Sequence, residues 1–110
     1  MAVHHTIDAR IEIPRERIAE FCRKWKVMEF ALFGSVLRDD FGAESDVDVM
    51  VTFEPEAQPT FFDLVDMQDE LADLFGRPVD LLTRPGIERS RNRFRRRAIL
   101  ESARVVYAAP

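Results

Sequence analysis

The chain reads FGSVLR at residues 33–38 and SDVDVMV at residues 45–51, and these two segments indicate both a fold and a site. The second segment alternates in polarity, the pattern of a β-strand whose successive side chains point to opposite faces. Asp46 and Asp48 are therefore expected on one face, with Cα atoms about 6.6 Å apart. Two carboxylates so placed can share a hard cation such as Mg²⁺, which takes oxygen ligands together with substrate phosphates. The two segments predict a metal-dependent phosphate site.

The glycine and serine of the first segment follow an almost uninterrupted apolar run at residues 27–33. Such a run predicts a largely buried strand that ends in a tight turn. Gly34 would let phosphates approach the backbone without a Cβ in the way, and Ser35 would offer a hydroxyl and a backbone N–H at a helix start. Arg38, one turn later, could neutralise phosphate charge. The turn is therefore a candidate phosphate-binding element.

A third carboxylate, Asp80, lies among valine and leucine residues in a strand predicted at residues 77–83. A charged group in such a strand is costly unless it has a partner. If Asp80 faces the same side as Asp46 and Asp48, it could bind the cation nearest an attacking hydroxyl and also accept the hydroxyl proton. The alternative reading of each aspartate alone is a solvated strand edge.

The rest of the chain alternates between helical and extended patterns. We expect helices at residues 14–26, 60–75 and 87–102, a short helical segment from Ser35, a loop at 42–45, strands at 27–33, 46–53 and 77–83, and an edge strand at 105–107. This order predicts an α/β fold, with a small mixed sheet of three to four strands flanked by helices. The phosphate-facing residues would then cluster at one edge of the sheet.

Helical spacing also predicts which helix faces are buried. The expected buried positions are Ile18, Phe21, Cys22 and Trp25 in the first helix, Phe61, Leu64, Val65, Gln68, Leu71, Ala72 and Phe75 in the second, and Phe94 and Ala98, together with Ile87 or Arg91, in the last.

Length and composition favour one ordinary domain over residues 1–110, with residues 1–10 as a tail. His4 and His5 would then be exposed tail residues and not metal ligands. Cys22 is the single cysteine, so no internal disulfide can form. No leader pattern and no apolar run of the roughly 20 residues needed to cross a bilayer is seen, so we expect a cytoplasmic protein without a membrane anchor.

Charge is segregated along the chain. Residues 84–110 hold eight arginines against two glutamates, a formal charge of +6, so that with a total of −4 residues 1–83 carry −10. The basic helix could bind nucleic acid, nucleotide or an acidic partner, pair with the acidic body, or be a solvated face. The interleaved aromatic residues of a base-stacking surface are missing from the expected exposed face.

The segment FGSVLRDDFGAESDVDVMV at residues 33–51, with RPVDLLT at 77–83, resembles the core of the DNA polymerase β-like nucleotidyltransferase superfamily. The resemblance is to its minimal, single-domain branch and spans about residues 11–107. In that family the Gly-Ser turn and three strand carboxylates bind a nucleoside triphosphate and Mg²⁺. The resemblance implies catalytic and metal-binding roles for Asp46, Asp48 and Asp80, and nucleotide-binding roles for Gly34 and Ser35. Arg38 and Ser45 are further candidate nucleotide-binding residues.

The resemblance also implies a biological setting, because minimal nucleotidyltransferases are commonly antitoxins of HEPN-domain ribonuclease toxins. Such an antitoxin transfers AMP from ATP to a tyrosine hydroxyl of its toxin, with Mg²⁺ as cofactor. The chain departs from many relatives by having Asp39 and Asp40 after the arginine, where they have glycine. Two alternatives remain open: a non-catalytic antitoxin that occludes its partner, and a nucleic-acid-binding module that uses the basic helix.

Overall fold

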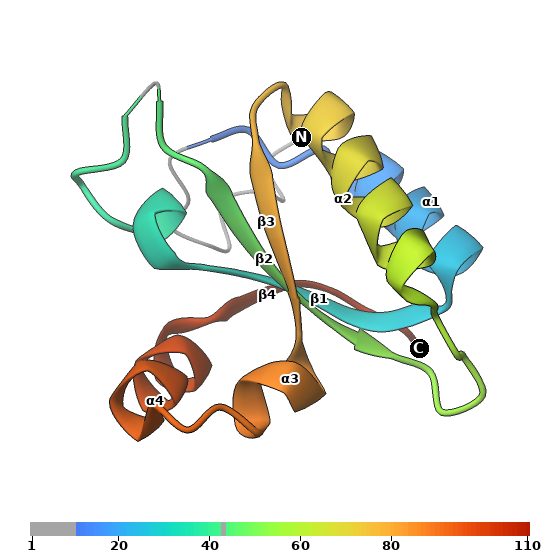
Figure 1. Cartoon of the computed structure of the whole chain (residues 1–110). Helices are drawn as coiled ribbons and strands as arrows, with labels where there is room; N and C mark the ends of the chain where they lie inside the picture. Colours follow the sequence, from blue (N-terminus) through green and yellow to red (C-terminus); the bar gives the residue numbers. More distant parts are fainter. Residues whose placement is uncertain (1–10, 43) are drawn as a thin grey trace.

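The computed structural model describes residues 11–42 and 44–110, so the tail expected at residues 1–10, with His4 and His5, lies outside the described residues. A mixed sheet flanked by helices forms its centre (Figure 1). The elements in chain order are α1 (Arg15–Trp25), β1 (Val27–Phe33), the 3-10 helix η2 (Gly34–Leu37), β2 (Val47–Phe53), α2 (Phe61–Phe75), β3 (Val79–Thr83), α3 (Arg84–Glu88), α4 (Arg93–Ser102) and β4 (Arg104–Ala108). The predicted mixed α/β fold is confirmed.

The four strands lie in the order β3-β2-β1-β4. β1 pairs antiparallel with both β2 and β4, whereas β2 and β3 are parallel. The parallel pair is joined through α2, as a crossover connection requires. This pairing sets the register of the site, because Asp48 of β2 lies opposite Asp80 of β3.

Helices α1 and α2 cover one face of the sheet (Figure 1). The predicted stripe of α1 is confirmed for Ile18, Phe21 and Cys22, which are buried, while Trp25 packs at the margin of the same core. The valines at positions 47, 49 and 51 of β2 are also buried on this side. This face therefore holds the larger of the two cores.

The buried stripe of α2 agrees with the prediction in part, because Leu71 is buried and Leu64, Ala72 and Phe75 pack against the same core. Met67 and Leu71 are its fully buried residues, whereas Phe61 is 73% exposed and Val65 is also exposed. The first turn of α2 is apolar on several sides, so its periodicity allows more than one stripe, and packing against the sheet selects the one through Met67. The helix begins at a capping box between Thr60 and Asp63, worth about 1 kcal/mol.

The basic segment forms two helices, and not the single helix predicted at residues 87–102. The Thr83 side chain accepts a hydrogen bond from the Gly86 N–H and starts α3, with Pro85 in the first turn, where its missing N–H is tolerated. The Asn92 side chain then accepts from the Arg95 N–H and starts α4. The second cap, at Asn92, divides the basic segment into two helices, and the sequence analysis did not identify it.

Helices α3 and α4 cover part of the other face of the sheet (Figure 1). Ile99 is the buried residue of α4, and Ile87 of α3, one of the positions predicted to be buried, lies in the same core. Phe94 is 81% exposed and Ala98 is also exposed, so the prediction for these two residues was wrong. A second, smaller core here contains Ala31, Phe33, Met50, Ile87 and Ile99. No helix in the described part of the chain is both long and apolar enough to span a membrane.

Candidate functional site

Three carboxylates lie on the sheet face that α3 and α4 only partly cover. Asp48 and Asp80 are register partners in the parallel pair of β2 and β3, and Asp46 comes directly before β2. Because side chains alternate along a strand, Asp46 and Asp48 share a face. Asp48 and Asp80 are half-buried and Asp46 is exposed. No hydrogen bond or ion pair joins these three side chains to another described residue.

The electrostatics of this cluster act most strongly on Asp48. Burial raises the pKa of its carboxyl group above the ordinary value, and the negative charges of Asp80 and Asp46 raise it further. The positive charges of Arg95 and Arg38 oppose the shift. The surroundings of the Asp48 carboxylate therefore favour binding of a cation.

Replacing Asp48 with asparagine should stabilise the metal-free chain at neutral pH. A carboxyl group whose pKa is raised on folding binds more protons in the folded state, so stability falls as pH rises from 3.8, its ordinary pKa, through the folded value. Thermal melts in EDTA at several pH values should show Asp48→Asn melting above the wild type at pH 7, with the difference vanishing in acid. An equal or lower melting temperature for Asp48→Asn at pH 7 would contradict this electrostatic account.

Gly34 lies directly against the Asp48 carboxylate. It follows Phe33, the β1 residue opposite Asp48, and has a left-handed backbone with φ of 76°. A Cβ at this position would overlap the Asp48 Oδ2 atom. The next residue, Ser35, donates a long hydrogen bond of 3.5 Å from its hydroxyl to the Asp46 carbonyl oxygen. The Gly-Ser turn is thus built onto the carboxylate-bearing strand.

Arg38 lies at the end of η2, where its side chain forms an exposed ion pair with Asp40. The Nε to Oδ1 distance is 3.1 Å. Its charge also lowers the pKa of Asp48, after the larger raising effect of burial. An exposed pair of this kind contributes roughly 0–1 kcal/mol, so a phosphate group could readily replace Asp40 as its partner.

The loop before Asp46 is fixed by Arg77, which was not singled out from the sequence. One guanidinium nitrogen donates to the carbonyl oxygens of Gly42 and Ser45, each at 3.0 Å, and the guanidinium lies 4.5 Å from the Phe41 ring centroid. The Ser45 hydroxyl accepts the Gly42 N–H within the same loop. Arg77 therefore positions the chain that leads into the carboxylates, and no spacing in the sequence signals this role.

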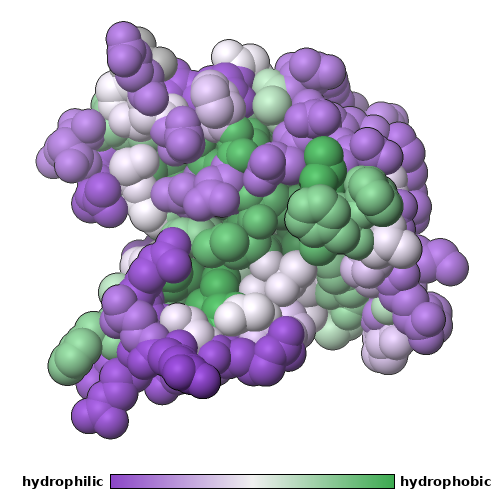
Figure 2. Space-filling view, viewed as in Figure 1, coloured by the Kyte–Doolittle hydropathy of each residue, from purple (hydrophilic) through white to green (hydrophobic). Residues whose placement is uncertain are grey.

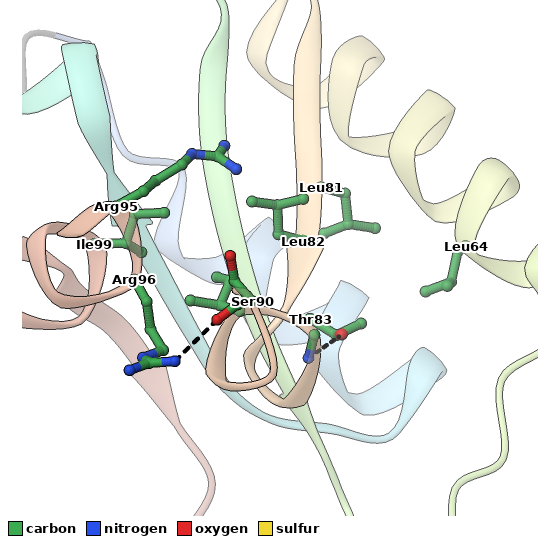
Figure 3. Close-up of a pocket in the computed structure, with 10 residues that line it drawn as sticks. Leu64, Leu81, Leu82, Thr83, Ser90, Arg95, Arg96 and Ile99 are labelled. Atoms are coloured by element: carbon green, nitrogen blue, oxygen red, sulfur yellow. Dashed lines mark hydrogen bonds between the residues drawn. The ribbon is translucent and has the colours of Figure 1, made fainter. Parts of the chain in front are cut away.

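A pocket of about 450 Å³ adjoins the carboxylate face, and Figure 3 shows its lining. Leu82, which lies two residues after Asp80 and on the same side of β3, forms part of its floor. The lining residues are Leu64, Leu81, Leu82, Thr83, Gly86, Ile87, Ser90, Arg95, Arg96 and Ile99. In Figure 2 the surface is hollowed above the hydrophilic C-terminal segment, with hydrophobic residues at the bottom of the hollow.

The arginines of α4 point to two sides. Arg95 lines only the pocket, whereas Arg93 and Arg97 border a second, outer hollow together with Phe94. Arg96 lies between the two and lines both. The exposed Phe94 supplies an aromatic ring to the outer basic face, which the sequence was expected to lack. Binding of a partner or of nucleic acid by this outer face stays a prediction.

The carboxylates suit a metal ion that is held jointly with a substrate. Within the described ranges, no three His, Cys, Asp or Glu side chains form a ready-made cluster that could hold a metal ion. Mg²⁺ usually binds proteins through one or two carboxylates and completes its shell with waters and substrate phosphates. The oxygen-only donors at Asp46, Asp48 and Asp80 fit such an ion.

Solved structures share this fold. A structure described as a "putative minimal nucleotidyltransferase" is 29% identical, with a TM-score of 0.63 over 82% of this chain and 86% of that chain. The MNT antitoxin complex with a tri-AMPylated Shewanella oneidensis HEPN toxin matches with a TM-score of 0.58 and 18% identity, over 86% of this chain and 70% of that chain. The architecture is therefore nucleotidyltransferase-like.

Sequence comparison identifies the family. The nucleotidyltransferase domain family matches residues 15–106, and the chain belongs to this family. A relative from Methanocaldococcus jannaschii named "Putative protein adenylyltransferase" is 39% identical over 64 residues. That match covers 58% of this chain and 64% of the relative, slightly under two thirds of its length. The family resemblance predicted from residues 33–51 and 77–83 is confirmed.

Proposed function

We propose that this chain transfers AMP from ATP to a hydroxyl group of a protein partner, a tyrosine of a HEPN-domain toxin, and thereby acts as an antitoxin. The observation that carries this proposal is the grouping of Asp46, Asp48 and Asp80 on one sheet face beside Gly34. Carboxylates next to Gly34, which has no side chain, suit Mg²⁺ that is bound together with a triphosphate. Family membership supports the same reaction class.

Each residue of the site has a proposed role in this reaction. Asp46 and Asp48 hold Mg²⁺ together with the triphosphate, and Gly34 keeps the Asp48 carboxylate free of steric overlap. Arg38 exchanges Asp40 for a phosphate group, and Ser35 and Ser45 hold the backbone on either side of the site. When bound, Mg²⁺ neutralises phosphate charge and favours deprotonation of the attacking hydroxyl.

The proposed reaction is a displacement at the α-phosphorus of ATP. The partner's hydroxyl oxygen attacks the α-phosphorus of ATP and forms a new P–O bond, while the bond between the α-phosphorus and the bridging oxygen to the β-phosphate breaks. Pyrophosphate leaves. Asp80, on the strand next to Asp48, accepts the hydroxyl proton, since a carboxylate beside the reacting group can act as a general base.

A HEPN-domain toxin is the proposed acceptor because a solved MNT antitoxin of the same fold is bound to an AMPylated HEPN toxin. Both hydrophobic cores of the described residues pack against the same four-stranded sheet. In this proposal the acceptor is selected by docking of the partner protein itself.

Intact-mass spectrometry of the partner tests this function. After incubation of the HEPN-domain protein with this chain, ATP and Mg²⁺, we expect the partner to gain the mass of one or more AMP groups, located on tyrosine by peptide mapping. A partner that is neutralised without any gain in mass would instead establish the occluding, non-catalytic antitoxin.

A further inference from the structure

Arg95 lies on the inner side of α4. It comes one helical turn before Ile99, the residue that anchors α4 to the sheet, and residues four apart share a helix face. Both residues line the pocket beside the carboxylates. In Figure 3 the Arg95 side chain extends from α4 towards β2, the strand that carries Asp48. The sequence did not distinguish this arginine from its neighbours.

Unlike two adjacent arginines, Arg95 has an uncommitted guanidinium group. Arg96 donates to the Ser90 carbonyl oxygen at 2.9 Å, and Arg97 pairs with Glu101 at 2.8 Å. The Arg95 side chain makes no hydrogen bond or ion pair with any residue in the described ranges. All of its donors are therefore available to a ligand in the hollow.

The charge of Arg95 lies on the side of Asp48 although the two form no ion pair. The Arg95 side chain extends towards the strand that carries Asp48, so its positive charge acts on that carboxylate, as the charge of Arg38 also does. Cations that bind the carboxylates with a nucleotide would satisfy Asp48 and repel Arg95 from it. The nearest remaining anion would be the nucleotide's phosphate chain, to which a guanidinium group can donate two parallel hydrogen bonds.

We propose that Arg95 binds the phosphate chain of the nucleotide, so that α4 forms the wall of the site opposite η2. This inference rests on the proposed function, because it requires a nucleotide at the carboxylates. It divides the basic segment into an inner arginine that binds substrate and an outer face around Phe94 that does not.

Calorimetry with two ligands tests the inference on the full chain. Arg95→Gln should weaken binding of ATP with Mg²⁺ by about tenfold to a hundredfold, the loss expected for a charge-assisted hydrogen bond. Inorganic tripolyphosphate with Mg²⁺, which has phosphates but neither base nor ribose, should lose affinity by a similar factor. Arg95→Lys, which keeps the positive charge, should restore part of the affinity for both ligands.

Arg93→Gln is the matched control, since it removes the same charge from the outer face of the same helix. Its affinity for both ligands should stay within about twofold of the wild type, because solvent and salt screen a distant exposed charge. Thermal melts check that both variants fold; Arg95 is exposed, so its replacement should leave the melting temperature unchanged.

Several results would overturn the inference. Equal losses for Arg95→Gln and Arg93→Gln would reduce Arg95 to general surface charge, and weakened ATP binding with unchanged tripolyphosphate binding would assign it to the base or ribose. A wild-type chain that binds ATP but not tripolyphosphate also contradicts it. If the wild type binds ATP and Arg95→Gln binds it equally well, only this inference fails, whereas a wild type that binds no ATP removes the proposed function as well.

Discussion

Replacing Asp46 and Asp48 together with asparagine is expected to reduce AMP transfer by about 10³-fold or more while the chain stays folded. Nucleotidyl transfer depends on positioning and on neutralising phosphate charge, and these side chains are the proposed ligands of the ion that does both. Asparagine keeps the size of each side chain and removes its charge. The same double variant should bind ATP with Mg²⁺ far more weakly than the wild type does.

The stability of the double variant should not fall, because burial and the neighbouring charges of Asp80 and Asp46 disfavour the charged form of Asp48. The double variant should therefore melt at or above the wild-type temperature. The control is Asp66→Asn with Asp69→Asn, which removes two exposed charges from α2, away from the carboxylate face. The account is contradicted if both double variants transfer AMP equally well, or if loss of activity accompanies unfolding.

Replacing Gly34 with alanine is expected to abolish ATP binding at only a moderate cost in stability. The left-handed backbone, with φ of 76°, makes any L-residue there unfavourable by about 1–2 kcal/mol. The added Cβ would also overlap the Asp48 Oδ2 atom. Because that oxygen is the end of a half-exposed side chain, the carboxylate can rotate away, which relieves the overlap but removes Asp48 from its position in the site.

Gly76→Ala provides a control with the same backbone strain. Gly76 ends α2 with φ of 72°, and nothing lies within 4 Å of a Cβ placed there. Chemical denaturation should show that the two alanine variants lose similar stability, about 1–2 kcal/mol each. Calorimetry with ATP should separate them, since only Gly34→Ala disturbs Asp48. Retained ATP affinity in Gly34→Ala would show that the Asp48 position is not needed for nucleotide binding.

Local patterns were enough to predict most of the elements and the face shared by two carboxylates. Alternation along residues 46–53 fixes the common orientation of Asp46 and Asp48, and the apolar run before Gly34 identifies β1. Both conclusions depend only on neighbouring residues. The mixed α/β fold and the family follow from the same segments.

Features that depend on long-range packing were not predictable from these patterns. The register that brings Asp80 opposite Asp48 depends on how α2 crosses between two parallel strands. The rotation of α4 that buries Ile99 and exposes Phe94 depends on the caps that separate α3 from α4.

The contacts of the long arginine side chains were also not predictable from the sequence. Arg77 fixes a loop more than thirty residues earlier in the chain, through the carbonyl oxygens of Gly42 and Ser45. Arg95 reaches from α4 towards a strand in the middle of the sheet (Figure 3). Such contacts span elements whose relative placement only the tertiary structure defines, so neighbouring arginines look equivalent in the sequence.

The measurement that tests the central claim most directly follows the phosphorus atoms of ATP. The HEPN-domain partner is incubated with this chain, Mg²⁺ and ATP that is labelled at either the α- or the γ-phosphorus. We predict that the α-label becomes bound to the partner and that the γ-label is released as pyrophosphate. Label from the γ-position on the partner, or a neutralised partner that carries neither label, would contradict nucleotidyl transfer.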